Sequence, residues 1–180
     1  MHVLSAALLV TCSLCVAARP ALAQHIPTLD GFGAASSPHE FQSRFRGATC
    51  TKTQFSMGTQ KAESVICTAK GSYLVRAAEY KASFSDGGMS GIAVHVVAAN
   101  DALRLAPDLV RSLSASYGAP TENYLASPEK MKNEGGVAAR WVFRPTALVT
   151  LTLCGPSLYV NRTGCPDNRI IVDLMYNRRQ

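Results

Sequence analysis

Alternation of apolar and polar residues predicts most of the strands in this chain. Apolar side chains alternate with polar ones from 78 to 84, and after a turn signal at Asp86-Gly87-Gly88 the alternation resumes over 92–98. A period of two is typical of a hairpin with one buried face. Similar but shorter patterns predict five more strands, over 49–55, 64–69, 139–143, 147–153 and 170–176.

End signals predict two helices. The segment Ser37-Pro38-His39-Glu40 has the pattern of a capping box with proline at the first helical position, and Gly47 can end this short helix. A second helix is expected to have Pro107 in its first turn and Gly118 just beyond its end. Its buried stripe is predicted to consist of Leu109, Val110, Leu113 and Tyr117.

The order of elements, helix, four strands, helix, three strands, predicts an α+β fold. Short turns favour a mainly antiparallel sheet with the two helices packed on one face. A length of 180 residues suits a single α+β domain over 24–180, in which 24–36 is an extended lead-in and 122–136 a long mobile loop. The halves 37–99 and 100–180 share this plan, which leaves open a duplicated helix-plus-strands unit, although their cysteines do not align.

The first 23 residues are predicted to be a signal peptide, which places the mature protein in the periplasm or outside the cell. An apolar run without acidic residues leads to Ala21-Leu22-Ala23, so cleavage is expected after Ala23. The alternative is lipidation at Cys12, where Thr11 is a poor preceding residue. No later stretch has the about 20 apolar residues of a spanning helix.

Four cysteines remain after cleavage: Cys50, Cys67, Cys154 and Cys165. An even number in an exported chain indicates two disulfides, for which three pairings are open. We favour Cys50–Cys67 and Cys154–Cys165 because each closes a short loop. No C-x-x-C pair occurs and the histidines are scattered, so we expect no metal and no cofactor.

The sequence also lacks the patterns of common catalytic sites, and we expect a protein that is not an enzyme. There is no G-x-S-x-G motif, and Glu79 and Asp173 alternate with apolar residues and so are expected to be exposed. His95 lies in the middle of a predicted strand, where it is interpreted as a half-buried sheet residue. The alternative is that His95 is the base of a small hydrolase.

The charge of the mature chain suggests an anionic partner. Removal of Arg19 with the leader leaves 17 Lys+Arg against 12 Asp+Glu, a net charge of 17 − 12 = +5. Arg140 and Arg144 are predicted to project opposite Trp141 and Phe143, and Lys81 to lie on the same face. Such a face could bind an anionic envelope component or an acidic protein, or it could simply be solvated. Nucleic acid is not expected, because the aromatic residues fall on the apolar face.

Two phrases in the sequence resemble small exported bacterial proteins with the β-lactamase-inhibitor-protein-like fold, which include the inhibitor itself and small outer-membrane assembly lipoproteins. The first is Gly31-Phe32-Gly33 followed by Ser37-Pro38-His39-Glu40-Phe41. The second is Leu113-x-x-x-Tyr117-Gly118-x-Pro120 before an aromatic-bearing strand. The resemblance implies a helix-and-sheet protein that binds another protein. The chain departs from these proteins because it lacks a lipobox. The resemblance identifies no functional residue in this chain.

The expected function is therefore that of a non-enzymatic binding protein, such as an inhibitor or an envelope-assembly partner, which acts through surface loops. Tyr159 and Arg162 in the loop between Cys154 and Cys165 are candidate contacts, as is Tyr124 in the segment 122–136. Tyrosine and arginine are enriched among interface anchors. The alternative for Tyr159 is that its ring folds back onto Trp141 or Tyr176.

Non-reducing peptide mapping of the mature protein tests the disulfide pairing. We expect one linked pair of peptides that contains Cys50 and Cys67 and a second that contains Cys154 and Cys165, because local pairs form without long-range chain closure. A peptide that links Cys50 to Cys154, or Cys67 to Cys165, would contradict this pairing.

Overall fold

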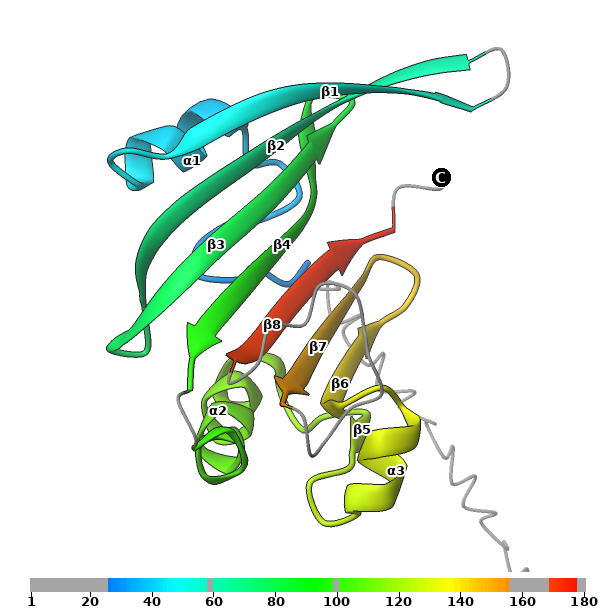
Figure 1. Ribbon diagram of the computed structural model, residues 1–180. Helices are drawn as coiled ribbons and strands as arrows, with labels where there is room; N and C mark the ends of the chain where they lie inside the picture. Colours follow the sequence, from blue (N-terminus) through cyan, green and yellow to red (C-terminus); the bar gives the residue numbers. More distant parts are fainter. Residues whose placement is uncertain (1–25, 58–59, 99–100, 156–168, 178–180) are drawn as a thin grey trace, which may run out of the picture.

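The structure is a computed structural model that describes residues 26–57, 60–98, 101–155 and 169–177. Eight strands form one antiparallel sheet in the order β1-β2-β3-β4-β8-β7-β6-β5 (Figure 1). The strands are β1 (Thr49–Met57), β2 (Gln60–Tyr73), β3 (Arg76–Ser85), β4 (Gly88–Val97), β5 (Glu122–Asn123), β6 (Val137–Phe143), β7 (Ala147–Cys154) and β8 (Arg169–Tyr176). The helices are α1 (Pro38–Arg44), α2 (Ala102–Tyr117) and α3 (Pro128–Asn133).

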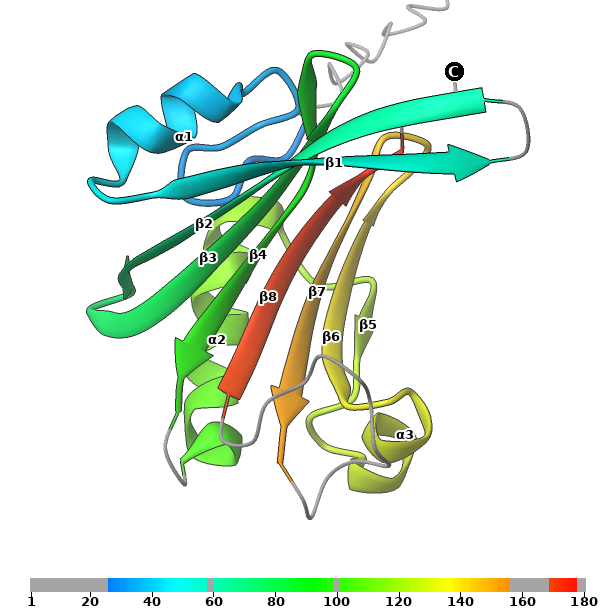
Figure 2. The same cartoon turned by 45° about the horizontal axis from the view of Figure 1, so that its top comes forward.

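The predicted α+β class and the antiparallel sheet are confirmed. The two predicted helices, α1 and α2, pack on the same face, where the in-phase residues of the central strands are buried. Helix α2 runs behind the sheet against β6, β7 and β8 (Figure 2). The alternation of the strands thus leaves a second face on which neither α1 nor α2 packs, and we call this the open face.

Helix α1 begins as its sequence predicts. The Ser37 hydroxyl accepts from the Glu40 amide, and the Glu40 carboxylate accepts from the Ser37 amide at 2.7 Å, which completes the capping box. On its inner side Phe41 is fully buried, with its ring centroid 5.0 Å from that of Phe45 and 5.4 Å from that of Phe32. This aromatic cluster fixes a helix of seven residues that would not be stable alone.

Helix α2 ends at Gly118 as predicted, but the prediction of its start was wrong. Pro107 is the sixth residue of the helix rather than part of its first turn, since the helix begins at Ala102. Proline cannot donate to the carbonyl of Leu103, four residues earlier. Both residues are exposed, so water can satisfy that carbonyl, and the buried stripe from Leu105 to Leu113 holds the helix in place.

The segment 122–136 is not the long loop that its polar composition suggested. It contains the two-residue strand β5 and the helix α3, which has Pro128 at its N-terminus. Met131 is the one fully buried residue of α3, and a single apolar position gives no periodic signal. Two glycines at positive φ, Gly135 and Gly136, follow the helix and turn the chain into β6.

The two halves of the sheet join at the pair β4–β8, where Val94 lies opposite Val172. Helix α1 precedes the meander β1–β4, and α2 precedes β5–β8, with α3 between β5 and β6. The proposed duplication of 37–99 and 100–180 stays a prediction, because a shared order of elements is also compatible with independent origins.

Hydrogen bonds from three tyrosines fasten the lead-in segment to the core. Tyr80 donates to a carboxylate oxygen of Asp30 at 2.8 Å, Tyr117 donates to the carbonyl of Thr28, and Tyr176 donates to that of Pro27. Burial raises the pKa of Tyr117 to about 12, so its hydroxyl remains a donor throughout the physiological range. The segment is therefore part of the folded domain.

The predicted disulfide between Cys50 and Cys67 is confirmed and joins β1 to β2. Cys154 is also disulfide-bonded, but its expected partner Cys165 lies outside the described residues. Because Leu151 and Leu153 are expected to face the core, the alternation places Cys154 on the opposite, solvent-facing side of the sheet, and the sequence predicts a bridge beside solvent. Cys154 does lie on the open face, but it is buried, so this expectation is wrong on the Cys154 side.

Removing the first disulfide should lower stability without unfolding the protein. For Cys50→Ala/Cys67→Ala we expect a loss of about 3 kcal/mol in unfolding free energy, because the bond closes a loop of 17 residues. Urea unfolding followed by circular dichroism measures it, with Lys52→Ala, which breaks an exposed ion pair between the same strands, as a control near zero. Loss of the native spectrum in the double variant would contradict the prediction.

Candidate binding surface

Parts of the open face are buried. Ile171, Thr150, Thr152 and Cys154 are buried there although neither α1 nor α2 covers them. Register places Lys81, Ala93, Asp173, Thr150 and Arg140 in one row across β3, β4, β8, β7 and β6. Lys81 and Arg140 therefore share a face as predicted, but Asp173 lies between them.

Arg140 belongs to a network of charged side chains at the β5 edge. Its guanidinium lies 2.8 Å from a carboxylate oxygen of Glu122 and 2.9 Å from one of Glu134. The Arg140 side chain is only 25% exposed. Two carboxylates thus neutralise the charge of Arg140, which the sequence suggested as a contact for an anionic partner. Such a partner would have to compete with Glu122 and Glu134 for the guanidinium.

Tyr124 is held in the same network. Its hydroxyl donates to Glu122 at 3.0 Å. Hydrogen bonds from Arg140 and Tyr124 hold the pKa of the Glu122 carboxyl below its usual range, so the network persists in mildly acidic solution. Sequence patterns could not predict this contact, since Glu122 and Arg140 are 18 residues apart and meet only because β5 pairs with β6.

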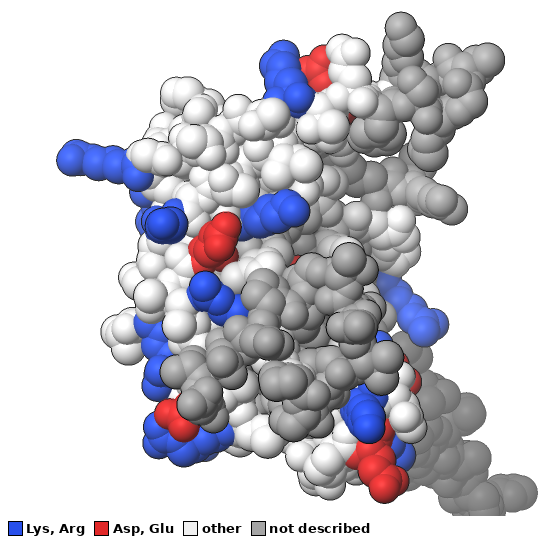
Figure 3. Space-filling view, viewed as in Figure 1, with Lys and Arg blue, Asp and Glu red and all other residues white. Residues whose placement is uncertain are grey.

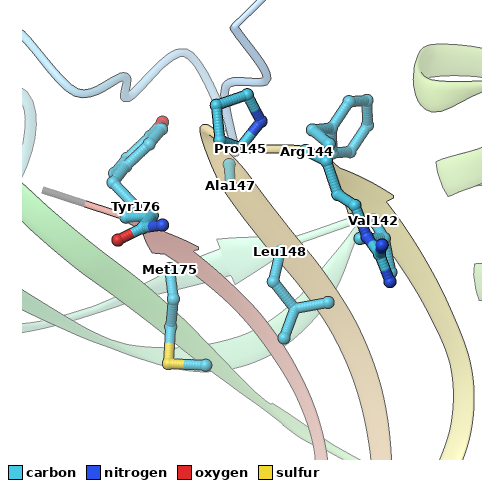
Figure 4. A pocket seen from close by; sticks show the side chains of 9 residues that line it. Val142, Arg144, Pro145, Ala147, Leu148, Met175 and Tyr176 are labelled. Carbon is cyan, nitrogen blue, oxygen red and sulfur yellow. The ribbon is translucent and has the colours of Figure 1, made fainter. Parts of the chain in front are cut away.

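Arg144 borders a depression of about 330 Å³ between the β6–β7 turn and the end of β8 (Figure 4). Met175 and Leu148 extend from β8 and β7 on the open face, and Val142 completes their row on β6. Met175 is 52% exposed. We call Val142, Arg144, Leu148 and Met175 the β7–β8 patch.

Gly91 lies opposite Met175 and contributes no side chain to this part of the open face. A Cβ atom on Gly91 would lie 3.1 Å from the carbonyl oxygen of Leu174 and 3.7 Å from Cγ of Met175. Because Gly91 has no side chain that could cover it, the Met175 side chain remains accessible to solvent. Methionine is flexible enough to adapt to a partner's surface.

Sequence reasoning missed Val142, Leu148 and Met175 as members of a surface. The signal was present, because each is an apolar residue out of phase with the buried set of its own strand. In a sheet covered on one face, such residues point away from the core.

His95 is a half-buried sheet residue, in agreement with its first interpretation. Register surrounds it on the open face with Glu79 and Lys81 of β3, Ile171 and Arg169 of β8, and apolar residues of β4. Thr152 is the nearest hydroxyl in its row and lies two strands away, about 9–10 Å. A general base must lie within hydrogen-bond reach of its nucleophile, so this arrangement gives no support to the hydrolase alternative.

Tyr159 and Arg162 lie outside the described residues, and their roles stay predictions. Within the ranges that the structure describes, no group of three or more histidine, cysteine, aspartate or glutamate residues is placed to hold a metal ion. No helix in those ranges is both long and apolar enough to cross a membrane.

Comparisons of the chain with protein-family models, curated proteins and solved structures found no match. The resemblance to the β-lactamase-inhibitor-protein-like fold therefore stays a prediction.

The protonation of His95 should oppose folding. Burial lowers its pKa below 6.5, Glu79 acts in the opposite direction, and Lys81 and Arg169 lower it further. Below pH 6.5 the unfolded chain then binds more protons than the folded one, so stability falls as the pH drops from 6.5 towards the folded pKa. Urea unfolding across this range should show a smaller loss for His95→Gln than for the wild type. Equal slopes would contradict the prediction.

Proposed function

We propose that this protein is an exported, non-enzymatic binding protein that contacts another protein through the β7–β8 patch. The observation that carries the proposal is Met175, a large apolar side chain that stands exposed on a sheet face beside an arginine. Methionine and arginine are both enriched in protein–protein interfaces relative to the rest of the surface. An inhibitor or an envelope-assembly partner would use such a patch.

The composition of the patch favours a partner with an apolar anchor and a nearby carboxylate. Leu148 and Met175 can pack against an apolar side chain, and Arg144 places a positive charge at the rim that attracts a carboxylate. Pro145 stiffens the β6–β7 turn that carries Arg144, which lowers the entropy lost on binding.

Export to the periplasm or the exterior belongs to the same proposal. The Cys50–Cys67 disulfide is compatible with an oxidising compartment, where such bonds persist. The A-x-A site at Ala21-Leu22-Ala23 supplies the route. The predicted loop residues Tyr159 and Arg162 could extend the contact surface.

Substitution of Met175 tests the proposal. Proteins captured from an envelope extract by the wild type should be lost with Met175→Asp, because a carboxylate would face the partner's apolar anchor. With the captured protein purified, we expect the Kd to rise about 30-fold, which corresponds to about 2 kcal/mol. Isothermal titration calorimetry measures it.

The matched control is Val75→Asp, the same kind of change at a fully exposed position at the opposite end of the sheet. It should leave this affinity unchanged, and both variants should keep the wild-type melting temperature within a few degrees. A purified partner that binds Met175→Asp as tightly as wild type would refute the assignment of the patch. Capture of nothing above background would count against the binding function itself.

A further inference from the structure

The turn between β2 and β3 combines unfavourable backbone geometry with exposed apolar side chains. Tyr73 pairs with Arg76, so Leu74 and Val75 alone form the turn, with φ of 46° and 61°. Left-handed backbone at a branched residue is rare, and each such residue costs about 1–2 kcal/mol. Val75 is fully exposed and Leu74 is 45% exposed, so neither side chain recovers that cost by packing in the core.

The neighbouring hairpin forms the same turn with suitable residues. Asp86 and Gly87 connect β3 to β4, with φ of 48° and 78°. Aspartate and glycine are the residues that two-residue hairpin turns of this type favour. The same sheet thus contains an Asp-Gly turn and a Leu-Val turn of similar geometry, so the fold does not require leucine and valine at positions 74 and 75. Strained residues of this kind cluster at functional sites.

Other exposed apolar residues lie at the same end of the sheet. Val97 ends β4, which pairs with β3, and Leu103 lies in the first turn of α2, directly after the connection from β4. Four of the six exposed large apolar residues in the described ranges belong to this end. Figures 1 and 2 both place the β2–β3 turn, the end of β4 and the start of α2 along one margin of the molecule. We call Leu74, Val75, Val97 and Leu103 the apolar margin.

Arginines flank the apolar margin. A hydrogen bond from Arg104 holds the pKa of the Asp101 carboxyl below its usual range, and Arg76, which follows the turn, lies close enough to lower it further. Arg169 pairs in register with Val97. Figure 3 shows that Lys and Arg predominate over Asp and Glu along this side of the molecule. The margin is therefore apolar at its tip and basic around it.

We propose that the apolar margin docks on an anionic lipid surface, with Leu74 and Val75 inserted at the level of the headgroups and Arg76 and Arg169 against the phosphates. A protruding tip of aliphatic side chains surrounded by cations fits a membrane interface, where apolar burial and attraction to anionic lipids add. A protein partner is less well matched, because leucine and valine are under-represented among interface hot spots. The contact is separate from the β7–β8 patch and does not depend on the proposed function.

Vesicle sedimentation with the chain from Gln24 onward tests this contact. Wild type should sediment with vesicles of phosphatidylcholine and phosphatidylglycerol, and much less with phosphatidylcholine alone. Leu74→Asn/Val75→Gly should reduce the partition coefficient about tenfold or more, because it removes both inserted side chains. The same change places preferred residues in the turn, so its melting temperature should rise, which excludes misfolding as the cause of lost binding.

A charge variant and a matched control complete the experiment. Arg76→Gln/Arg169→Gln should reduce binding to the anionic vesicles about fivefold per arginine, and added salt should have a similar effect. Lys52→Gln, which removes an exposed cation of β1 far along the sheet from the β2–β3 turn, should bind as wild type does.

Three outcomes would overturn the proposal. One is a wild-type protein that does not sediment with anionic vesicles, and another is that Leu74→Asn/Val75→Gly sediments as well as wild type. The third is that Leu74→Asn/Val75→Gly loses a captured protein while vesicles bind neither chain, which would assign the turn to a protein partner. Loss of partner capture with Met175→Asp tests the proposed function alone, so the two failures can be told apart.

Discussion

The pairing of β4 with β8 is the contact on which the rest of the structure depends. Each half of the chain ends its meander at this pair, seven registered positions long, from Gly91–Met175 to Val97–Arg169. Its in-phase residues, such as Val94, Val172 and Leu174, are fully buried on the helix side. Without it each half would expose a long unpaired edge, which is an aggregation hazard. With it the sheet becomes continuous, and the remaining edges are β1 and the two-residue β5.

A continuous sheet covered by helices on one side divides the side chains of every strand into two sets. The in-phase set forms the core. The residue types of the other set depend on contact with solvent, with partners or with cross-strand neighbours. The network of Arg140 with Glu122 and Glu134 illustrates the third case. Met175 is an exposed apolar member of this set, and Gly91 beside it has no side chain to cover it.

Local signals predicted the elements well where the local energy decides the structure. The capping box at Ser37 and Glu40, the stop at Gly118 and the alternation over 78–98 all act within a few residues, and each is realised. Predictions were wrong where tertiary contacts decide: the buried stripe holds α2 through Pro107, and Met131 alone anchors α3. The surface was least predictable. Cross-strand partners such as Glu122 and Arg140 depend on the pairing of β5 with β6, and a Leu-Val pair is the opposite of a turn signal.

The positions of the two exposed surfaces are compatible with one protein that uses both at the same time. Met175 lies six positions after Arg169 in β8, a distance of about 20 Å along the strand. A contact that reaches only the headgroup region from the Arg169 end would leave the β7–β8 patch well above the lipid. The strained turn at Leu74 lowers stability, but the buried β4–β8 centre lies apart from it and can tolerate that loss. A turn with Asp-Gly, like that between β3 and β4, would make a more stable sheet with no apolar tip.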